Sequence, residues 1–326
     1  MPQFSDCPRQ RFFRIRTFLP ECLGSNSYNV HLRKNLATYR ERTLFSKTMN
    51  DTIGILGLGL IGSAIAARLN AADYKVIGFD PAVPKMQGVS SACNPTEVFT
   101  RSELVILCLP DGNDVRAVIN EVQSIIHERH LIINTTTTGD ADRPHAQMIE
   151  ATIGGSSALL RDGAAPLFLG GDKAQISCAQ PILDILSSRS FHLGDFGTGA
   201  KFKLIHNMAI GLNRAVAAET LCFAEALGFD LNQSLDILLQ SPASSTAMAA
   251  KGQRMIEAEY QPPQARLAQH LKDVRLILAA AEETSTKVPL TQLHEELLSR
   301  AESRGFGNAD NAAIIEAYRE DKPCLD

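Results

Sequence analysis

The glycine-rich turn G-x-G-x-x-G, made by Gly57, Gly59 and Gly62, constrains the fold of this chain more than any other feature. The apolar run 53–56 before it has the composition of a buried parallel strand. Apolar residues then recur at helical spacing over residues 61–69. A strand, a glycine turn and a helix form the context in which this motif binds a dinucleotide. The sequence therefore predicts that an α/β fold of the Rossmann type opens here.

Each glycine of the turn has its own expected role. Gly57 permits the tight turn, Gly59 lets the backbone approach a pyrophosphate, and Gly62 lets helix and strand pack closely. The phosphates would lie on the first helical turn, beside Leu60 and Ile61, where free N–H groups and the helix dipole favour anions. The alternative is a glycine-rich turn that binds no ligand.

The second expected strand, Tyr74–Asp80, ends in an acid 18 residues after Gly62. An acid at this position accepts hydrogen bonds from the adenosine ribose hydroxyls and repels the 2′-phosphate of NADP. The next residues are Pro81 and Ala82, so no arginine follows directly. We therefore expect NAD rather than NADP, unless Asp80 merely ends the strand.

Two further apolar runs, at 104–110 and 130–138, have strand character and alternate with helical segments. This alternation predicts a doubly wound parallel sheet, within a domain at 51–197. Ligands bind beyond the carboxyl ends of such strands. We therefore expect Leu109, Pro110 and the threonines that end the second run to lie near the nicotinamide half of the cofactor.

Two stretches near the expected strand ends are candidate substrate contacts. The hydroxyls of Thr135–Thr138 can bind a substrate carboxylate, or the backbone can satisfy them. Gly154, Gly155 and Ser156 form a small-residue turn whose N–H groups could hold an anion. That turn could equally be selected for its conformation alone, so the residues leave both questions open.

A long helical pattern follows Gly197 and Gly199 and ends at Gly228, a suitable helix C-cap. Lys203 and Asn207 are four residues apart on it and share a face. The lysine of a helix otherwise rich in apolar residues either reaches solvent or is held for chemistry. Burial would lower its pKa, and a neutral lysine could take the proton of a hydroxyl whose carbon loses hydride.

The order of the motifs points to a family. The segments "GLGLIGSAIAARL", "LPD", "NTTTTGD", "ATIGGSSALLRDGAAPLFLGG", "GTGAKFKLIHN" and "LKD" follow one another over roughly residues 51–318. This order resembles the β-hydroxyacid dehydrogenases, which include 3-hydroxyisobutyrate dehydrogenase and semialdehyde reductases and are related to 6-phosphogluconate dehydrogenase. The resemblance implies an all-helical C-terminal domain at 198–318, including a long connecting helix, and association into a homodimer or homotetramer.

The resemblance also implies roles for single residues. Lys203 matches the catalytic lysine of G-x-G-x-x-x-K-x-x-x-N, and Asn207 ends the same motif. Thr136 falls on the substrate-binding serine of D-x-S-T and is also expected beside the cofactor. No metal is implied. The other implied substrate contacts are Gly154, Gly155, Ser156, Lys272 and Asp273.

The departures from the family pattern concern mainly the substrate. The motif D-x-S-T reads Asn134 to Thr137 here, and the serine of the S-G-G turn is Gly154. His206 stands where many members have asparagine. Because the lysine is retained while its surroundings are altered, the resemblance predicts the chemistry and leaves the acid open.

Charge and composition exclude other classes. Residues 1–48 carry nine Lys/Arg and three Asp/Glu, a net charge of +6. Because the whole chain has a net charge of −4, the remaining residues carry −10. An acidic body argues against a nucleic-acid partner. No apolar run approaches the roughly 18 residues of a membrane span. We interpret 1–48 as an extension outside the fold, with a transit peptide or a functional basic arm as alternatives.

The seven cysteines are odd in number, scattered, and form no C-x-x-C pair. A reducing compartment, the cytoplasm, is therefore expected, with mitochondria as the alternative if residues 1–48 target the chain.

Together these features predict an NAD(P)-dependent oxidoreductase acting on a short β-hydroxyacid such as 3-hydroxyisobutyrate, or reducing the matching semialdehyde. Imine reductases share the architecture but usually carry Asp or Tyr where this chain has Lys203. A 6-phosphogluconate dehydrogenase needs a longer helical domain. A cofactor-binding scaffold without catalysis is the alternative from another class, and such proteins typically lose the lysine.

Overall fold

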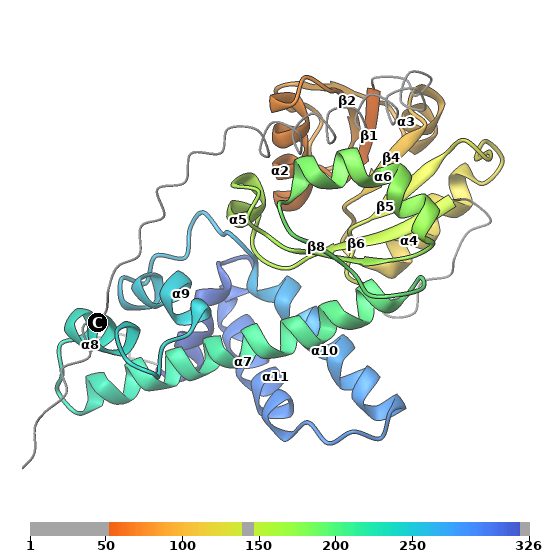
Figure 1. Cartoon of the computed structure of the whole chain (residues 1–326). Helices are drawn as coiled ribbons and strands as arrows, with labels where there is room; N and C mark the ends of the chain where they lie inside the picture. The colour runs from red at the N-terminus through yellow and green to blue at the C-terminus, as the bar shows by residue number, and fades with distance from the viewer. Residues whose placement is uncertain (1–51, 139–146, 320–326) are drawn as a thin grey trace, which may run out of the picture. The chain divides into compact units, whose positions relative to one another are not determined.

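A computed structural model of the chain describes residues 52–138 and 147–319 (Figure 1). The predicted extension at 1–48 lies outside the described residues. Within them a sheet of eight strands has the order β3-β2-β1-β4-β5-β6-β7-β8. Every neighbouring pair is parallel except β6 and β7, which are antiparallel. The predicted doubly wound parallel sheet is therefore confirmed, with one antiparallel pairing that the apolar runs did not indicate.

The strands are short and apolar. Their bounds are β1 (Thr52–Leu56), β2 (Lys75–Phe79), β3 (Val89–Ser91), β4 (Leu104–Leu107), β5 (Leu131–Asn134), β6 (Gln147–Ile153), β7 (Leu167–Gly170) and β8 (Ser190–His192). The central strands β1, β4 and β5 are almost entirely buried, as expected where helices cover both faces of a parallel sheet.

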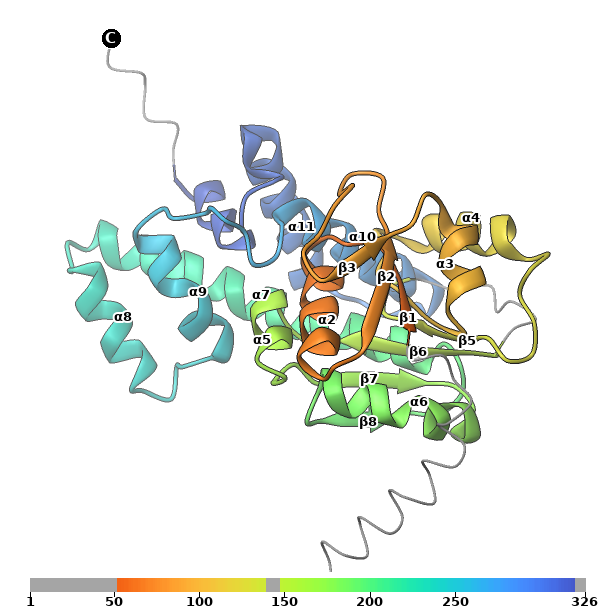
Figure 2. The same ribbon diagram turned by 90° about the horizontal axis from the view of Figure 1, so that it is seen from above.

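Helices cover both faces of the sheet, as the view in Figure 2 shows. On one face, α3 (Pro95–Arg101) and α4 (Gly112–Val122) pack with the strands into one apolar cluster. On the other face, α2 (Leu60–Ala71) packs against α5 (Ser157–Arg161) and α6 (Lys173–Leu186). The strand order reverses between β1 and β4, so the carboxyl ends of these two strands border the crevice where such sheets bind ligands.

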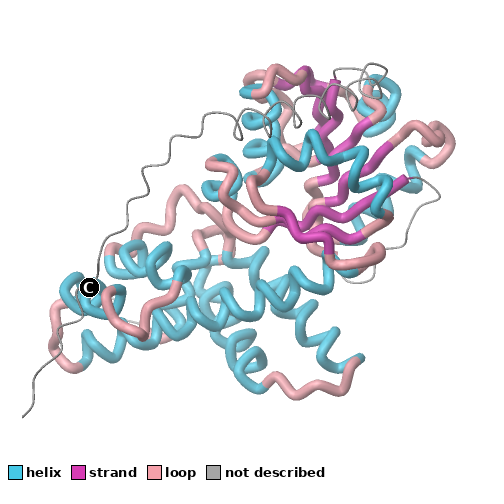
Figure 3. The backbone as a smooth tube through the Cα atoms, viewed as in Figure 1, coloured by secondary structure: helices cyan, strands magenta, loops and turns pink. Residues whose placement is uncertain are grey.

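The described residues after β8 are helical, apart from one isolated β-bridge between Arg266 and Asp310 (Figure 3). Their bounds are α7 (Thr198–Ala226), α8 (Leu231–Leu239), α9 (Thr246–Ile256), α10 (Leu267–Glu283), α11 (Pro289–Ala301), a π-helical turn at Glu302–Phe306 and a 3₁₀ helix at Asn311–Ala317. A second apolar core joins α7 to α9, α10, α11 and the 3₁₀ helix. None of the helices in the described ranges combines the length and apolar composition that crossing a bilayer requires.

Local signals in the sequence placed several boundaries well. Gly228 follows α7 with φ +79°, so it adopts the left-handed conformation expected of a glycine after a helix. Within the predicted all-helical domain, the segment that carries Lys272 and Asp273 is observed as α10. The strand expected to run through the four threonines ends earlier, at Asn134, because the N–H of Thr136 donates to Oδ1 of Asn134 at 3.0 Å instead of to β4. The proposed domain limits remain predictions.

The N-terminus of helix α7 is capped by a buried acid from a strand rather than by the side chain of its own N-cap residue. Its N-cap is Gly197, which has no side chain to accept a hydrogen bond. Instead, Oε2 of Glu150, in β6, accepts hydrogen bonds from the backbone N–H groups of Gly197 (2.8 Å), Gly199 (3.1 Å) and Ala200 (3.4 Å). Free N–H groups and the helix dipole attract an anion at this end. Glu150 therefore anchors α7 to the sheet.

Replacing Glu150 by alanine is expected to lower the free energy of unfolding by about 1–3 kcal/mol, because three backbone donors lose their charged acceptor. The matched variant Glu150→Gln keeps an amide oxygen at the same reach and should lose less. Urea denaturation followed by circular dichroism measures both. Equal midpoints for the wild type and Glu150→Ala would show that the contact does not stabilise the helix.

Candidate active site

The glycine turn has the geometry that its sequence predicts. Gly57 has φ +90°, and a Cβ there would collide with the carbonyl of Cys108. A Cβ on Gly62 would collide with the carbonyl oxygen of Gly57, so helix and strand approach too closely for any side chain. A Cβ on Gly59 would meet nothing within 4 Å. The middle glycine therefore borders open space, where a ligand can approach the backbone.

The N-terminus of α2 is left without a side-chain cap. Its N-cap is Gly59, and no acid lies in its first turn, which begins at Leu60 and Ile61. The neighbouring helices α4 and α6 are capped by the carboxylates of Asp111 and Asp172. An uncapped helix N-terminus behind a glycine turn suits the pyrophosphate of a dinucleotide. These residues therefore fit the expected cofactor.

The carboxylate of Asp80 lies just after β2 and is half-buried. Its Oδ2 accepts a hydrogen bond from Leu58 N–H at 2.7 Å, and its Oδ1 accepts one from Ala82 N–H at 2.8 Å. A carboxylate has about four acceptor sites, so each oxygen can accept one more hydrogen bond. The two backbone contacts hold the acid beside the glycine turn in a position to accept from a ribose hydroxyl.

At the carboxyl ends of β4 and β5, Thr136 links the two loops. Its buried Oγ1 accepts a hydrogen bond from Leu109 N–H at 3.1 Å, and its own N–H donates to Oδ1 of Asn134 at 3.0 Å. The carbonyl of Pro110 accepts a hydrogen bond from Nζ of Lys272 at 3.1 Å. The structure therefore brings Leu109, Pro110 and Thr136 together. The hydroxyl proton of Thr136 has no acceptor among the residues at 52–138 and 147–319, so it can be donated to a ligand.

The small-residue turn after β6 differs in one respect from the expectation. The N–H of Gly154 donates to the carbonyl of Pro166 at 2.7 Å, so it extends the pairing with β7 and cannot also hold an anion. Among the described residues, the N–H groups of Gly155 and Ser156 make no hydrogen bond. The Ser156 hydroxyl accepts from Leu159 N–H at 3.4 Å and caps α5. Two backbone donors of the predicted three therefore remain.

Lys203 lies at the buried end of α7, with only 8% of its surface exposed. Its Nζ donates a hydrogen bond to the carbonyl of Ile153 at 2.5 Å, directly before the small-residue turn. Burial lowers the pKa of Lys203 to about 8, while the nearby charge of Asp273 opposes this shift and those of Lys272 and Arg214 add to it. A lysine with this pKa exchanges a proton readily near neutral pH.

Asn207 and Asp273 form the next layer around the lysine. Nδ2 of Asn207 donates to Oδ2 of Asp273 at 2.8 Å, and both residues are buried. Nζ of Lys272 lies 3.0 Å from Oδ1 of Asp273 and donates to the carbonyl of Thr137 at 3.1 Å. Asn207 therefore orients the carboxylate and makes no hydrogen bond to Lys203 within the described part of the chain.

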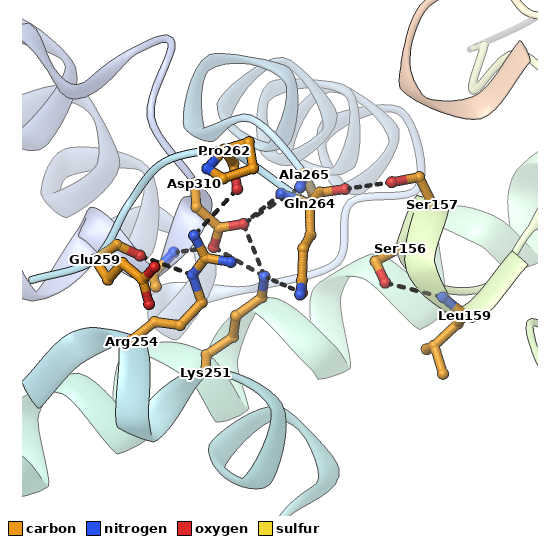
Figure 4. Close-up of polar contacts among 11 residues, drawn as sticks. Ser156, Ser157, Leu159, Lys251, Arg254, Glu259, Pro262, Gln264, Ala265 and Asp310 are labelled. Atoms are coloured by element: carbon orange, nitrogen blue, oxygen red, sulfur yellow. Dashed lines mark hydrogen bonds and ion pairs between the residues drawn. The ribbon is translucent and has the colours of Figure 1, made fainter. Parts of the chain in front are cut away.

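Lys272 joins α10 to the ends of β4 and β5, and a second contact joins the helices to the turn after β6. Figure 4 shows the hydroxyl of Ser157 donating to the carbonyl of Gln264 at 3.2 Å. The same view shows the ion pair of Lys251 and Asp310, at 2.8 Å, beside Gln264. The candidate site is thus bounded by strand ends on one side and helices on the other.

The sequence did not single out two residues that shape the site. Glu150 and the carbonyl of Ile153 position the helix and the lysine. An acid within an apolar strand was a usable signal for Glu150, whereas a backbone carbonyl leaves none. His206 lies beside Phe168, with ring centroids 5.3 Å apart. Burial and the charge of Lys203 lower its pKa to about 4, which keeps the imidazole neutral.

In chemical terms, the described residues combine a buried amine of lowered pKa, two backbone N–H groups without a partner among them, and an uncapped glycine turn that suits a dinucleotide. No group of three or more metal-binding side chains forms among the residues at 52–138 and 147–319. The roles of the individual site residues stay predictions.

Known proteins resemble this chain along nearly all of the described fold. Residues 52–194 match the family model of the NAD binding domain of 6-phosphogluconate dehydrogenase. Residues 197–318 match the model described as NAD-binding of NADP-dependent 3-hydroxyisobutyrate dehydrogenase. The two matches follow one another without overlap.

Individual relatives agree with these matches. Glyoxylate/succinic semialdehyde reductase 1 of Arabidopsis thaliana is 30% identical over 288 residues, which cover 82% of this chain and 98% of the relative. 2-(Hydroxymethyl)glutarate dehydrogenase of Eubacterium barkeri is 25% identical, covering 82% and 95%. The crystal structure of 3-hydroxyisobutyrate dehydrogenase from Salmonella typhimurium superposes with a TM-score of 0.74 at 22% identity, covering 81% and 99%.

The open space at Gly59 generates a test of the cradle. Gly59→Ala should leave the melting temperature close to that of the wild type, because the added Cβ meets no protein atom. It should weaken NADH binding at least about tenfold, or roughly 1.4 kcal/mol, by occupying the space of the phosphates. Calorimetric titration with NADH measures the affinity.

The matched control is Gly62→Ala, whose Cβ collides with Gly57 and should lower both stability and affinity. Undiminished NADH affinity in Gly59→Ala would place the cofactor elsewhere.

Proposed function

Because the chain belongs to the β-hydroxyacid dehydrogenase family of NAD(P)-dependent oxidoreductases, we propose that it transfers a hydride between nicotinamide and a short β-hydroxyacid such as 3-hydroxyisobutyrate. Reduction of the matching semialdehyde is the same reaction reversed. The observation that carries the proposal is Lys203, buried at the meeting point of strand ends and helices with its pKa lowered to about 8.

In the oxidative direction, the neutral amine of Lys203 takes the proton of the substrate hydroxyl. Bound NAD supplies the acceptor for the hydride that leaves the same carbon, so a hydroxyl becomes a carbonyl. The hydrogen bond to Ile153 fixes Nζ while two of its other positions stay free to face the substrate. Asp273, oriented by Asn207, stabilises the ammonium that forms.

In the reductive direction, the ammonium of Lys203 donates its proton to the carbonyl oxygen as the carbon gains hydride. With a pKa of about 8, roughly nine in ten lysines carry the proton at pH 7. The resting enzyme at neutral pH is therefore prepared for reduction, whereas oxidation draws on the minor neutral form.

The substrate carboxylate is proposed to lie on the N–H groups of Gly155 and Ser156 and on the hydroxyl of Thr136. The two N–H groups have no other partner among the described residues, and the threonine hydroxyl has a proton to donate. Gly154 is not included among these donors because its N–H already donates to the carbonyl of Pro166. Lys272 borders the same space from α10.

NAD is proposed as the preferred cofactor over NADP. The support is the carboxylate of Asp80, held beside the glycine turn by Leu58 and Ala82. A fixed negative charge there repels a 2′-phosphate and accepts from a free ribose hydroxyl.

A homodimer or homotetramer is proposed as the working assembly. One face of α7 leaves Ile205, Val216 and Phe223 exposed by 60%, 56% and 65%. Large apolar side chains in a row along one helix face are typical of a subunit interface. Sedimentation of the full chain at the mass of a monomer would refute this.

A cytoplasmic location is proposed from the cysteines, since Cys93 and Cys178 are exposed and unpaired. Mitochondrial fluorescence of a fusion carrying the full chain would instead assign a targeting role to residues 1–48.

Activity against short hydroxyacids is expected to depend on Lys203. Lys203→Ala should reduce kcat for oxidation by about 10²–10⁴, because the general base is lost. In the wild type, kcat/KM for oxidation should rise with pH and level off above about 8, since the neutral amine is the base. The kcat/KM for reduction should fall above about pH 8, because the protonated amine is the acid. Absorbance of NADH at varied pH measures both.

The matched control is Lys201→Ala, which removes an exposed lysine two residues away and should leave both profiles in place. If Lys203→Ala retained wild-type turnover, another group would carry the proton. NADH binding without turnover of any acid or semialdehyde in the wild type would favour the scaffold alternative.

The cofactor preference should depend on Asp80. The wild type should use NAD with at least about tenfold higher kcat/KM than NADP, and Asp80→Asn should reduce that ratio by removing the charge while keeping one acceptor oxygen. Steady-state kinetics with each cofactor gives the ratio, and an unchanged KM for the acid serves as the control. A wild type that favours NADP would contradict the role of Asp80.

A further inference from the structure

The polar face of α7 does not end at the candidate active site. Lys203, Asn207, Gly211 and Arg214 follow one another at helical spacing and are all buried. The first two belong to the site described above. Arg214 lies further along the same face, inside the helical region, and no step proposed above uses it.

Two histidines meet this face at Gly211. A Cβ on Gly211 would lie 2.5 Å from Nε2 of His270 and 2.6 Å from Cε1 of His294. The two rings come from α10 and α11, and their centroids are 5.2 Å apart. The charge of Arg214 contributes to lowering the pKa of both imidazoles, after burial as the main cause. Arg214, His270 and His294 therefore form one cluster.

The cluster is rich in unpaired polar atoms. Within residues 52–138 and 147–319, no hydrogen-bond partner exists for Nε and Nη1 of Arg214, Nε2 of His270, or either ring nitrogen of His294. Each of these side chains is more than nine-tenths buried. The charge of Asp310 favours the ionised form of Arg214, but a buried guanidinium nitrogen without an acceptor is still costly, because it has lost water and gained no hydrogen bond in return. The cluster therefore offers hydrogen-bond donors to an acceptor that the described residues do not supply.

The nearby carboxylates already have hydrogen-bond or ion-pair partners. Asp310 accepts hydrogen bonds from Nζ of Lys251 at 2.8 and 2.9 Å, from Gln264 N–H at 2.8 Å and from Ala312 N–H at 3.0 Å (Figure 4). These contacts fill the acceptor sites of a carboxylate. Asp273 is shared by Asn207 and Lys272.

The charges around the cluster leave a positive excess. The cations are Lys203, Arg214, Lys251 and Lys272, and the carboxylates are Asp273 and Asp310, so four minus two leaves +2 when every group is ionised. One anion, the substrate carboxylate at the strand ends, balances one of these charges. The other positive charge belongs to the cluster around Arg214.

We propose that Arg214, His270 and His294 form a second carboxylate site, and that the substrate is a dicarboxylate whose distal carboxylate it binds. This inference rests on the proposed function and narrows its substrate class. Arg214 is eleven residues after Lys203, a rise of about 16 Å along α7. The charge of Arg214 helps to lower the pKa of Lys203, so the two groups act on each other along this face of the helix.

Paired substrates test the site. The series is 2-(hydroxymethyl)succinate, -glutarate and -adipate, each beside the monoacid of equal length that has a methyl group in place of the distal carboxylate. The wild type should favour at least one dicarboxylate by about 10- to 100-fold in kcat/KM. In Arg214→Met this ratio should collapse towards one. The matched control, Arg275→Met, removes an exposed arginine of α10 and should keep the ratio.

Thermal melting gives a second readout that does not need turnover. Glutarate, which has no hydroxyl, should raise the melting temperature of the wild type and not that of Arg214→Met. Without ligand, Arg214→Met should melt no lower than the wild type, because it removes an unpaired buried charge. Acetate at the same concentration should have little effect. An equal effect of acetate would assign the site to a free monoanion and overturn the substrate class.

Other outcomes are equally decisive. An unchanged dicarboxylate ratio in Arg214→Met, or a wild type that prefers the monoacids, overturns the site and leaves the proposed function standing. A lower melting temperature for unliganded Arg214→Met, with no glutarate shift in the wild type, makes Arg214 structural. If neither the series nor 3-hydroxyisobutyrate turns over, the proposed function fails, and the glutarate shift still decides whether the carboxylate site exists.

Discussion

The contact between β6 and the first turns of α7 is the interaction on which the rest of the site depends. Glu150 binds three N–H groups at the start of the helix, and three residues further along the strand the carbonyl of Ile153 binds Nζ of Lys203. One strand therefore sets both the position of the helix and the position of its reactive amine. The small-residue turn follows directly, so the expected binding place of the substrate is fixed by the same backbone.

Burial gives Lys203 its proposed reactivity, and the neighbouring charges adjust it. Desolvation disfavours the ammonium and lowers its pKa, whereas the carboxylate of Asp273 favours the ammonium. Asn207 contacts that carboxylate and acts on the lysine through it, whereas Lys272 contacts the carboxylate and also lowers the pKa of Lys203 by its own charge. The substrate contacts can therefore vary while burial and Asp273 still set the pKa of Lys203.

Features with a local cause could be predicted from the sequence. The glycine turn, the acid after β2 and the glycine after α7 each answer a requirement of the nearby backbone, and the structure shows the geometry expected of them. Features that depend on contacts between distant segments could not be predicted from the sequence. The use of Gly154 N–H by Pro166, the anchoring role of Glu150 and the meeting of Arg214 with two histidines arise from pairing across the fold. Alternation of strands and helices likewise left the reversed direction of β7 open.

The missing side chain of Gly211 also constrains how this sequence could have changed. The rings of His270 and His294 occupy the volume that even a methyl group at position 211 would need. A packed core tolerates such an overlap poorly. The two rings in their present positions therefore require glycine at residue 211, and a larger residue there requires both rings to move or to be replaced. Substitutions at these three positions therefore depend on one another during evolution. Relatives with a larger residue at the equivalent of Gly211 should carry smaller residues at the equivalents of His270 and His294.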